Sequence, residues 1–124
     1  MILLDTNYLI RALVEGTSEA ERVSSWLEMD EEMCTSSICW YEFLSGPVDE
    51  DGIDLMRAVL LDRILPVVSD TSMEAARLFN ACGRNRRLRV HAMIAAAAVM
   101  TGAQLASGNR DDFSAFVSHG LKLV

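Results

Sequence analysis

The residues of this sequence best able to carry chemistry are carboxylates that follow apolar segments. Asp5 comes directly after the apolar run ILL, and Glu42 lies among the aromatic and apolar residues of WYEFL. A carboxylate on such a segment is costly to bury unless it is paired, protonated or bound to a cation. Asp111 and Asp112 follow the segment QLASGNR, where two acids can also serve only to offset a helix dipole. The pattern therefore indicates a cation site. The alternative is that Glu42 simply faces solvent and binds nothing.

The elements around these acids alternate between strands and helices. Short apolar runs predict strands at residues 1–5, 33–37, 64–68, 104–107 and 121–124. Helical patterns, punctuated by Gly and Pro, cover 8–14, 18–29, 37–46, 49–61, 70–83, 90–101 and 109–117. Strands that alternate with helices predict a parallel sheet covered on both faces, which is an α/β sandwich. Because ligands of such sheets bind beyond the carboxyl ends of the strands, the polar residues after each strand should converge there.

Composition predicts one domain with its own core. The chain has 124 residues, of which 51% are hydrophobic and 23% charged. Its three cysteines show no CxxC spacing, which favours a reducing compartment over a disulfide framework. The first acid comes too early for a signal peptide, and the apolar run 92–100 is too short to span a bilayer. A soluble cytoplasmic protein with no membrane partner is expected.

Charge is distributed unevenly along the chain. The formal net charge of −7 disfavours a general nucleic-acid binder. One basic cluster nevertheless stands out, and arginine suits contacts with phosphate, so a local RNA-binding surface is one reading. A solvated surface or ion pairs within the chain are the other reading. The candidate RNA-binding residues are Arg84, Arg86, Arg87, Arg89 and Arg110. Trp40 and Tyr41 could stack on bases, although a core or interface role is favoured for them.

Taken in order, the segments LLDTN, WYEFL, HAMIAAAAVM and SGNRDDF resemble the PIN-domain family, and within it the VapC-type toxins of toxin–antitoxin pairs. The resemblance covers essentially the whole chain and implies a single PIN-like domain over residues 1–124. The implied fold is a three-layer α/β sandwich, with a central parallel sheet of about four or five strands and helices on both faces. The implied activity is that of a metal-dependent endoribonuclease, in which clustered acids hold Mg²⁺ or Mn²⁺ that activates water for attack on an RNA phosphodiester.

The resemblance also implies partners. Toxins of this type usually dimerise and bind a cognate antitoxin whose segment covers the site. The expected partners are therefore an RNA substrate, an antitoxin protein and a second copy of the chain.

The first two acids of the family match Asp5 and Glu42 in this sequence. Thr6 and Asn7 match the residues beside the first acid, and we expect them to orient Asp5 or a metal-bound water. Both are also candidate caps of the first helix. The third acid normally opens a D-A-x-I-A pattern, which here reads HAMIA, so His91 stands at that position.

The last family position follows the fourth strand. Ser107 stands there for the usual threonine, Asn109 for the acid, and Asp112 matches a common N-x-x-D-F ending. The resemblance thus implies catalytic acids at Asp5, Glu42 and Asp112. The implied metal ligands are Asp5, Glu42, His91, Asn109 and Asp112, supported by Thr6, Asn7 and Ser107.

Three interpretations of His91 remain open from the sequence. As a metal ligand, an imidazole would favour Mn²⁺, Fe²⁺ or Zn²⁺ over Mg²⁺. As a replacement for a carboxylate, it would weaken the metal site and impair the enzyme. As a helix-start residue, it would only form local contacts. The alternative function is accordingly a catalytically inactive PIN-fold module that binds an antitoxin or RNA without turnover.

Overall fold

The computed structural model describes all 124 residues and contains one five-stranded sheet. The strands run in the order β3-β2-β1-β4-β5 and every neighbouring pair is parallel. Buried backbone groups must be hydrogen-bonded, and the central strand β1 satisfies its own groups from both sides, through β2 and β4. The strands are β1 (Ile2–Leu4), β2 (Met33–Ser36), β3 (Ile64–Leu65), β4 (Gln104–Ala106) and β5 (Lys122–Leu123).

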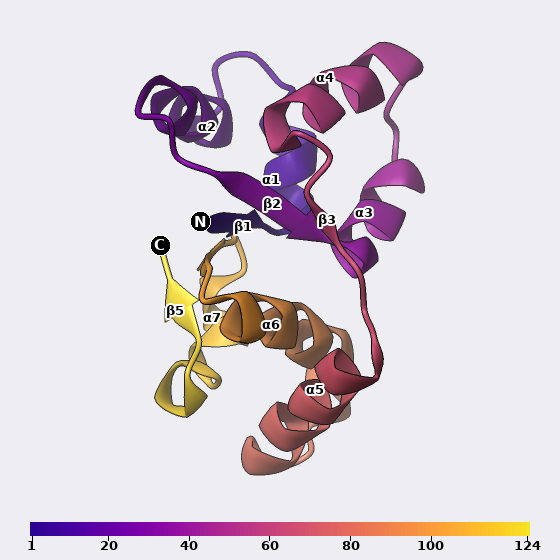
Figure 1. Cartoon of the computed structure of the whole chain (residues 1–124), viewed down its shortest axis with the longest axis vertical. Helices are drawn as coiled ribbons and strands as arrows, with labels where there is room; N and C mark the ends of the chain where they lie inside the picture. The colour runs from indigo at the N-terminus through magenta and orange to yellow at the C-terminus, as the bar shows by residue number, and fades with distance from the viewer.

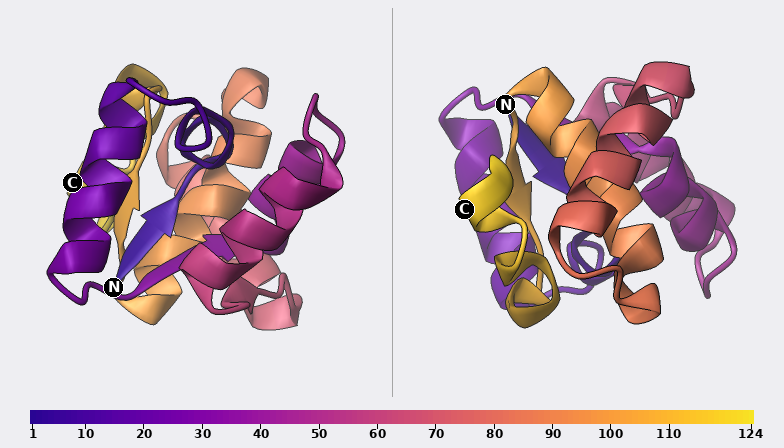
Figure 2. Two further views of the ribbon diagram at one scale, coloured as in Figure 1. Left: turned by 90° about the horizontal axis from the view of Figure 1, so that it is seen from above. Right: turned by 90° about the horizontal axis from the view of Figure 1, so that it is seen from below.

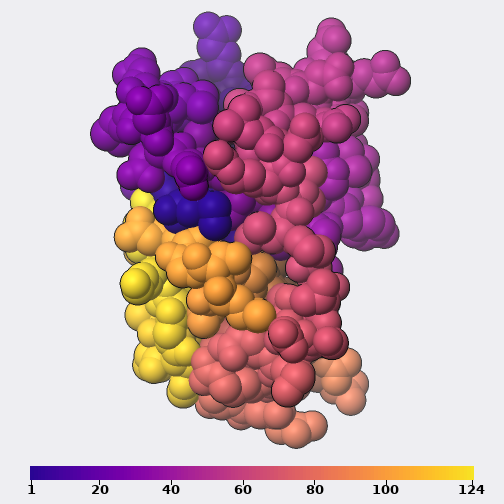
Figure 3. Space-filling model, viewed as in Figure 1, coloured from indigo at the N-terminus to yellow at the C-terminus, as the bar shows by residue number.

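Helices cover both faces of the sheet and make three layers (Figure 1). Seen from above, α2 and α4 lie over the sheet, whereas α5 and α6 lie over it from below (Figure 2). The space-filling view shows α2 and α4 forming the upper half of this face and α5 and α6 the lower half (Figure 3). The helices on the first face are α1 (Thr6–Arg11), α2 (Ser18–Glu28), α3 (Ser37–Leu44) and α4 (Glu50–Leu60). The remaining helices are α5 (Ser69–Ala81), α6 (Arg89–Thr101) and the short α7 (Arg110–Ser114), with 3₁₀ turns at Arg86–Leu88 and Val117–His119.

The alanine-rich helix α6 lies between the sheet and α5 (Figure 1). Its side chains from Ile94 to Ala98 are all buried, so the helix has no polar face over this stretch. Small side chains let the backbone of α6 approach its neighbours on every side. Gly102 ends the helix in the left-handed conformation, with φ of 70°, which glycine adopts at little cost. None of the helices is both long and apolar enough to cross a membrane.

The predicted α/β fold class is confirmed, including the parallel sheet of five strands between two helical layers. The prediction that Thr6 or Asn7 caps the first helix is wrong. The N-cap of α1 is Asp5 itself, whose carboxylate accepts a hydrogen bond from Thr6 N, and Thr6 is already the first helical residue. Strand β1 therefore passes into α1 with no intervening loop, and the turn places Asp5 at the carboxyl end of the sheet.

We predict that Ala96→Leu destabilises the protein by about 1–3 kcal/mol, because the larger side chain must enter a fully buried helix contact. Urea denaturation of the two proteins measures the difference in the free energy of unfolding. Ala76→Leu, at an exposed position of α5, is the matched control and should change stability by less than about 0.5 kcal/mol. Equal effects at the two positions would contradict the packing described for α6.

Candidate functional site

Asp5 is the centre of the candidate site. It follows the middle strand β1 and is only 4% exposed, yet no Lys, Arg or His side chain forms an ion pair with it. Its Oδ1 accepts a hydrogen bond of 2.8 Å from Thr6 N, and its Oδ2 accepts one of 2.6 Å from the Ser107 hydroxyl. These donors solvate the carboxylate in place of water, but they bring no positive charge.

Thr6 connects Asp5 to the second predicted acid. The Thr6 hydroxyl donates a hydrogen bond of 2.9 Å to Glu42 Oε1. Glu42 lies on α3, which begins where β2 ends because the Ser36 hydroxyl caps Cys39 N at 3.1 Å. Glu42 is exposed and forms no ion pair. The structure thus brings together Asp5, Thr6 and Glu42 at the carboxyl edge of β1 and β2.

The end of β4 supplies the third side of this network. Ser107 donates to Asp5 and at the same time accepts a hydrogen bond of 2.9 Å from Asn109 N. The backbone N of Asp112 in turn donates to the Asn109 carbonyl oxygen at 3.1 Å. Asn109 therefore takes part through its backbone, and its side chain makes no hydrogen bond to the other site residues. Asn7 is exposed and its side chain also contacts none of them through a hydrogen bond.

His91 and Asp112 form a second group with Arg87. His91 Nε2 lies 3.5 Å from Asp112 Oδ2, and Arg87 Nη1 donates a hydrogen bond of 2.7 Å to Asp112 Oδ1. The imidazole stands edge-on to the ring of Phe113, with the ring centroids 5.0 Å apart. His91 Nδ1 is buried and has no hydrogen-bond partner. No side-chain hydrogen bond joins this group to Asp5 or Glu42.

Cys39 is a site neighbour that the sequence did not single out. Its thiol points at Asp5 Oδ1, with a distance of 3.6 Å between sulfur and oxygen. Burial, and to a smaller extent the negative charge of Asp5, raises the pKa of Cys39 to about 12. The signal in the sequence was its position three residues before Glu42, which places the two side chains on one side of a helix.

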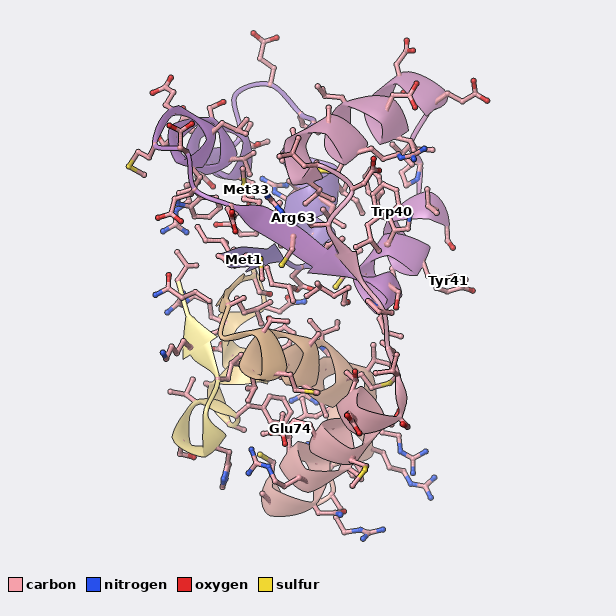
Figure 4. All side chains as sticks on the ribbon, viewed as in Figure 1. Met1, Met33, Trp40, Tyr41, Arg63 and Glu74 are labelled. Carbon is pink, nitrogen blue, oxygen red and sulfur yellow. The ribbon has the colours of Figure 1, made fainter.

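The predicted RNA-binding arginines lie on exposed surface, but they differ in their partners. Arg84 donates to Asn80 Oδ1 at 3.3 Å, Arg89 stacks over the Phe79 ring at 5.6 Å, and Arg110 donates to the carbonyl oxygen of the last residue. Arg86 makes no hydrogen bond or ion pair through its side chain. Of the two aromatic residues on α3, Tyr41 is 72% exposed and projects from the ribbon, whereas Trp40 packs on Phe43 with a centroid distance of 5.2 Å (Figure 4).

The donor set fits an oxygen-binding cation only in part. Asp5 and Glu42 are carboxylates linked through Thr6, whose backbone N donates to Asp5 and whose hydroxyl donates to Glu42, and neither has a positive partner; carboxylate oxygens are the ligands that Mg²⁺ and Mn²⁺ prefer. Asp112, by contrast, already has a positive partner in Arg87. No three side chains of the types His, Cys, Asp and Glu lie close enough together to form a metal cluster. A polar hollow of about 320 Å³ lined by residues 108–112 lies beside Asp112.

A comparison with protein families matches residues 2–117 to the PIN domain. Several solved structures share the fold. VapBC2 from Rickettsia felis bound to a DNA fragment from its promoter is 20% identical with a TM-score of 0.72, and the match covers 100% of this chain and 98% of that one. A toxin–antitoxin complex from Klebsiella pneumoniae is 22% identical with a TM-score of 0.73, over 92% and 91% of the two chains. FitAcB from Neisseria gonorrhoeae is 20% identical with a TM-score of 0.70, over 100% and 97%. No curated protein sequence matches significantly.

We predict that iodoacetamide at pH 8 modifies Cys82 in the folded protein well before Cys34 or Cys39. Burial raises the pKa of Cys34 to about 11 and that of Cys39 to about 12, so both thiols stay neutral as well as enclosed. Cys82 is only partly buried. Mass spectrometry of peptides from the treated protein measures the order of modification, and urea should make all three react alike.

The raised pKa values of Cys34 and Cys39 also determine how the stability of the fold changes at alkaline pH. A thiol with a raised pKa in the folded state favours folding fully below pH 9, and this contribution is lost as the pH rises towards 12. Rapid alkylation of Cys39 at pH 8 without unfolding would contradict the burial and the raised pKa of this thiol.

Proposed function

The chain belongs to the PIN domain family, and on that premise we propose that it is a metal-dependent endoribonuclease toxin held in check by a cognate antitoxin. The observation that carries the proposal is the buried carboxylate of Asp5, which has no positive partner in the protein. A buried anion of this kind is stabilised when a cation is bound beside it. Its position at the carboxyl edge of the middle strand is where parallel α/β sheets bind ligands.

In this proposal Asp5 and Glu42 hold the cation, and the neighbouring hydroxyls orient them. Thr6 fixes one oxygen of Glu42, and Ser107 fixes one oxygen of Asp5. A bound Mg²⁺ or Mn²⁺ would supply Lewis-acid chemistry at this edge, by lowering the pKa of water and offsetting charge on the phosphodiester. The second oxygen of Glu42 accepts no hydrogen bond from the protein and is free to bind the cation.

With His91 at the third family position, we expect the site to have low activity or to prefer Mn²⁺ over Mg²⁺. Its Nε2 faces Asp112 and not Asp5 or Glu42, so the third family position adds no negative charge to the acid pair. Losing a supporting group around a metal typically costs 10- to 100-fold in affinity or activity, and losing a ligand should cost at least as much. Nδ1 of His91 is buried and has no hydrogen-bond partner, and a cation that reached it would be one softer than Mg²⁺.

The exposed arginines supply the contacts we propose for RNA. Arg86 has no partner within the chain, and Arg84 and Arg89 are exposed beside it. Arg84 and Arg86 precede α6 and Arg89 opens it, two residues before His91, so phosphates bound to them would lie next to the site. Arg87 and Arg110 are engaged within the chain and would have to exchange partners to bind RNA.

The solved structures that share the fold are toxin–antitoxin assemblies, which supports an antitoxin as partner. An apolar groove of about 750 Å³ between α1 and the loop before α4 is the surface we propose for it. Leu13, Val48 and Leu55 line its apolar floor, and Asp49 and Asp51 add negative charge at its edge. An apolar antitoxin segment with a basic residue would complement both features. We also propose that residues 1–124 act as one domain and that two copies dimerise.

A second candidate function is a binding module of the same family without turnover. It is favoured by the absence of any three-residue metal cluster and by the ion pair that engages Asp112. Such a protein would keep the antitoxin and RNA contacts but would not cleave RNA.

We predict that wild-type protein cleaves a structured RNA slowly with Mn²⁺, and that His91→Asp increases the rate by roughly tenfold or more, because a carboxylate returns to the ligand set. Asp5→Asn should abolish cleavage by both proteins. Gel analysis of end-labelled RNA measures the rates. His119→Asp, which adds the same charge at the other histidine of the chain, should leave the rate unchanged.

Two results would contradict the proposal. Cleavage that survives Asp5→Asn would mean that the activity does not come from this site. No cleavage by wild type or by His91→Asp, with Mn²⁺ or Mg²⁺, would favour the binding module.

A further inference from the structure

We propose that Arg87 is a positioning residue that competes with the metal ion for Asp112 and so weakens cation binding at the site. This inference rests on the proposed metal-dependent function and concerns how that site is regulated from within the chain. In this inference Arg87 controls the charge of Asp112 and does not contact RNA.

The geometry of Asp112 carries the argument. Each of its two carboxylate oxygens faces a basic side chain, Oδ1 at 2.7 Å from Arg87 Nη1 and Oδ2 at 3.5 Å from His91 Nε2. None of the side-chain hydrogen bonds of Asp112 leads to Asp5, Thr6 or Glu42. The acid that could complete the ligand set therefore already accepts a hydrogen bond from Arg87 on one oxygen and has His91 against the other.

The backbone of Arg87 is held so that its side chain reaches Asp112. Arg87 lies in the 3₁₀ turn Arg86–Leu88, where the Asn85 side chain accepts a hydrogen bond of 3.1 Å from Arg87 N. Leu88 is buried and anchors the turn to the core. The neighbouring Arg86 leaves the same turn without any partner, so the pairing is specific to Arg87.

Charge explains the expected effect on a cation. An adjacent guanidinium cancels the negative charge that Asp112 would otherwise offer, and affinity for hard divalent cations rises with the number of charged oxygen ligands. The pair is also weak enough to open, because the side chain of Arg87 is 67% exposed and that of Asp112 is 25% exposed. A partly exposed pair of this kind can exchange its partner for a cation, whereas a buried pair would not.

Mn²⁺ binding to the purified protein tests the proposal, with free Mn²⁺ measured by electron paramagnetic resonance. Arg87→Gln should lower the Kd for Mn²⁺ by about two- to fivefold, which is the range that an exposed ion pair can contribute. Arg77→Gln is the matched control, because it breaks a similar exposed pair with Glu74 on α5 and changes the net charge equally. Its Kd should stay at the wild-type value. The gain from Arg87→Gln should disappear when Asp112→Asn is also present.

Several outcomes would overturn the inference. The Kd for Mn²⁺ could be unchanged or higher in Arg87→Gln, or it could fall equally in Arg77→Gln. It could also stay lower than that of Asp112→Asn alone when Arg87→Gln is combined with Asp112→Asn. Because Arg87 is exposed, Arg87→Gln should unfold at the wild-type urea concentration without metal, and Arg87→Lys should bind Mn²⁺ as weakly as wild type.

The test separates this inference from the proposed function. Tighter Mn²⁺ binding by Arg87→Gln without RNA cleavage by any variant would support the competition and contradict the nuclease. RNA cleavage by wild type with an unchanged Kd in Arg87→Gln would support the nuclease and contradict the competition.

Discussion

The burial of the Asp5 carboxylate is the constraint on which the rest of this site depends. An anion removed from water and left without a counter-charge must be solvated by the protein, and here the donors come from three different elements. Thr6 N belongs to α1, the Cys39 thiol to α3, and the Ser107 hydroxyl follows β4. A shift of any one of these elements would leave part of the carboxylate without a donor. The fold is therefore held to a specific arrangement at the point where a ligand would bind.

The sheet order explains how three distant parts of the sequence reach one carboxylate. Strand β1 lies between β2 and β4, so the residues that follow these strands meet on either side of Asp5. Helix α6 covers one face of these short strands with small, buried side chains. Two layers of helices then supply the burial that five short strands alone could not.

Sequence reasoning could predict the fold because its signals are local. Apolar runs, Gly stops and the alternation of element types point to a parallel sheet, and the polar residues after β1, β2 and β4 predict the edge where Asp5, Glu42 and Ser107 meet. It could not predict that Asp5 caps α1 itself, because this depends on β1 passing into the helix without a loop. It also could not predict that Arg87 turns to Asp112, since a basic cluster in sequence gives no partner for each side chain. Contacts between residues far apart in the chain require the tertiary structure, and 25 positions separate Arg87 from Asp112.

The site consists of two halves with opposite electrostatic character. Asp5 and Glu42 both accept hydrogen bonds from Thr6 and carry no compensating charge, whereas Asp112 lies between an arginine and a histidine. In the proposed function the first half would gain stability from a bound cation, whereas Arg87 already offsets the charge of Asp112 in the second half. A histidine at position 91 suits the half of the site around Asp112. A carboxylate at this position would face Asp112 and repel it unless a cation bound between them. The histidine and the arginine therefore act in the same direction, since neither adds to this side of the site a negative charge that a cation would have to offset. The shared fold fixes where the site lies, and in the proposed function the balance of charge between its two halves sets how strongly it holds a cation.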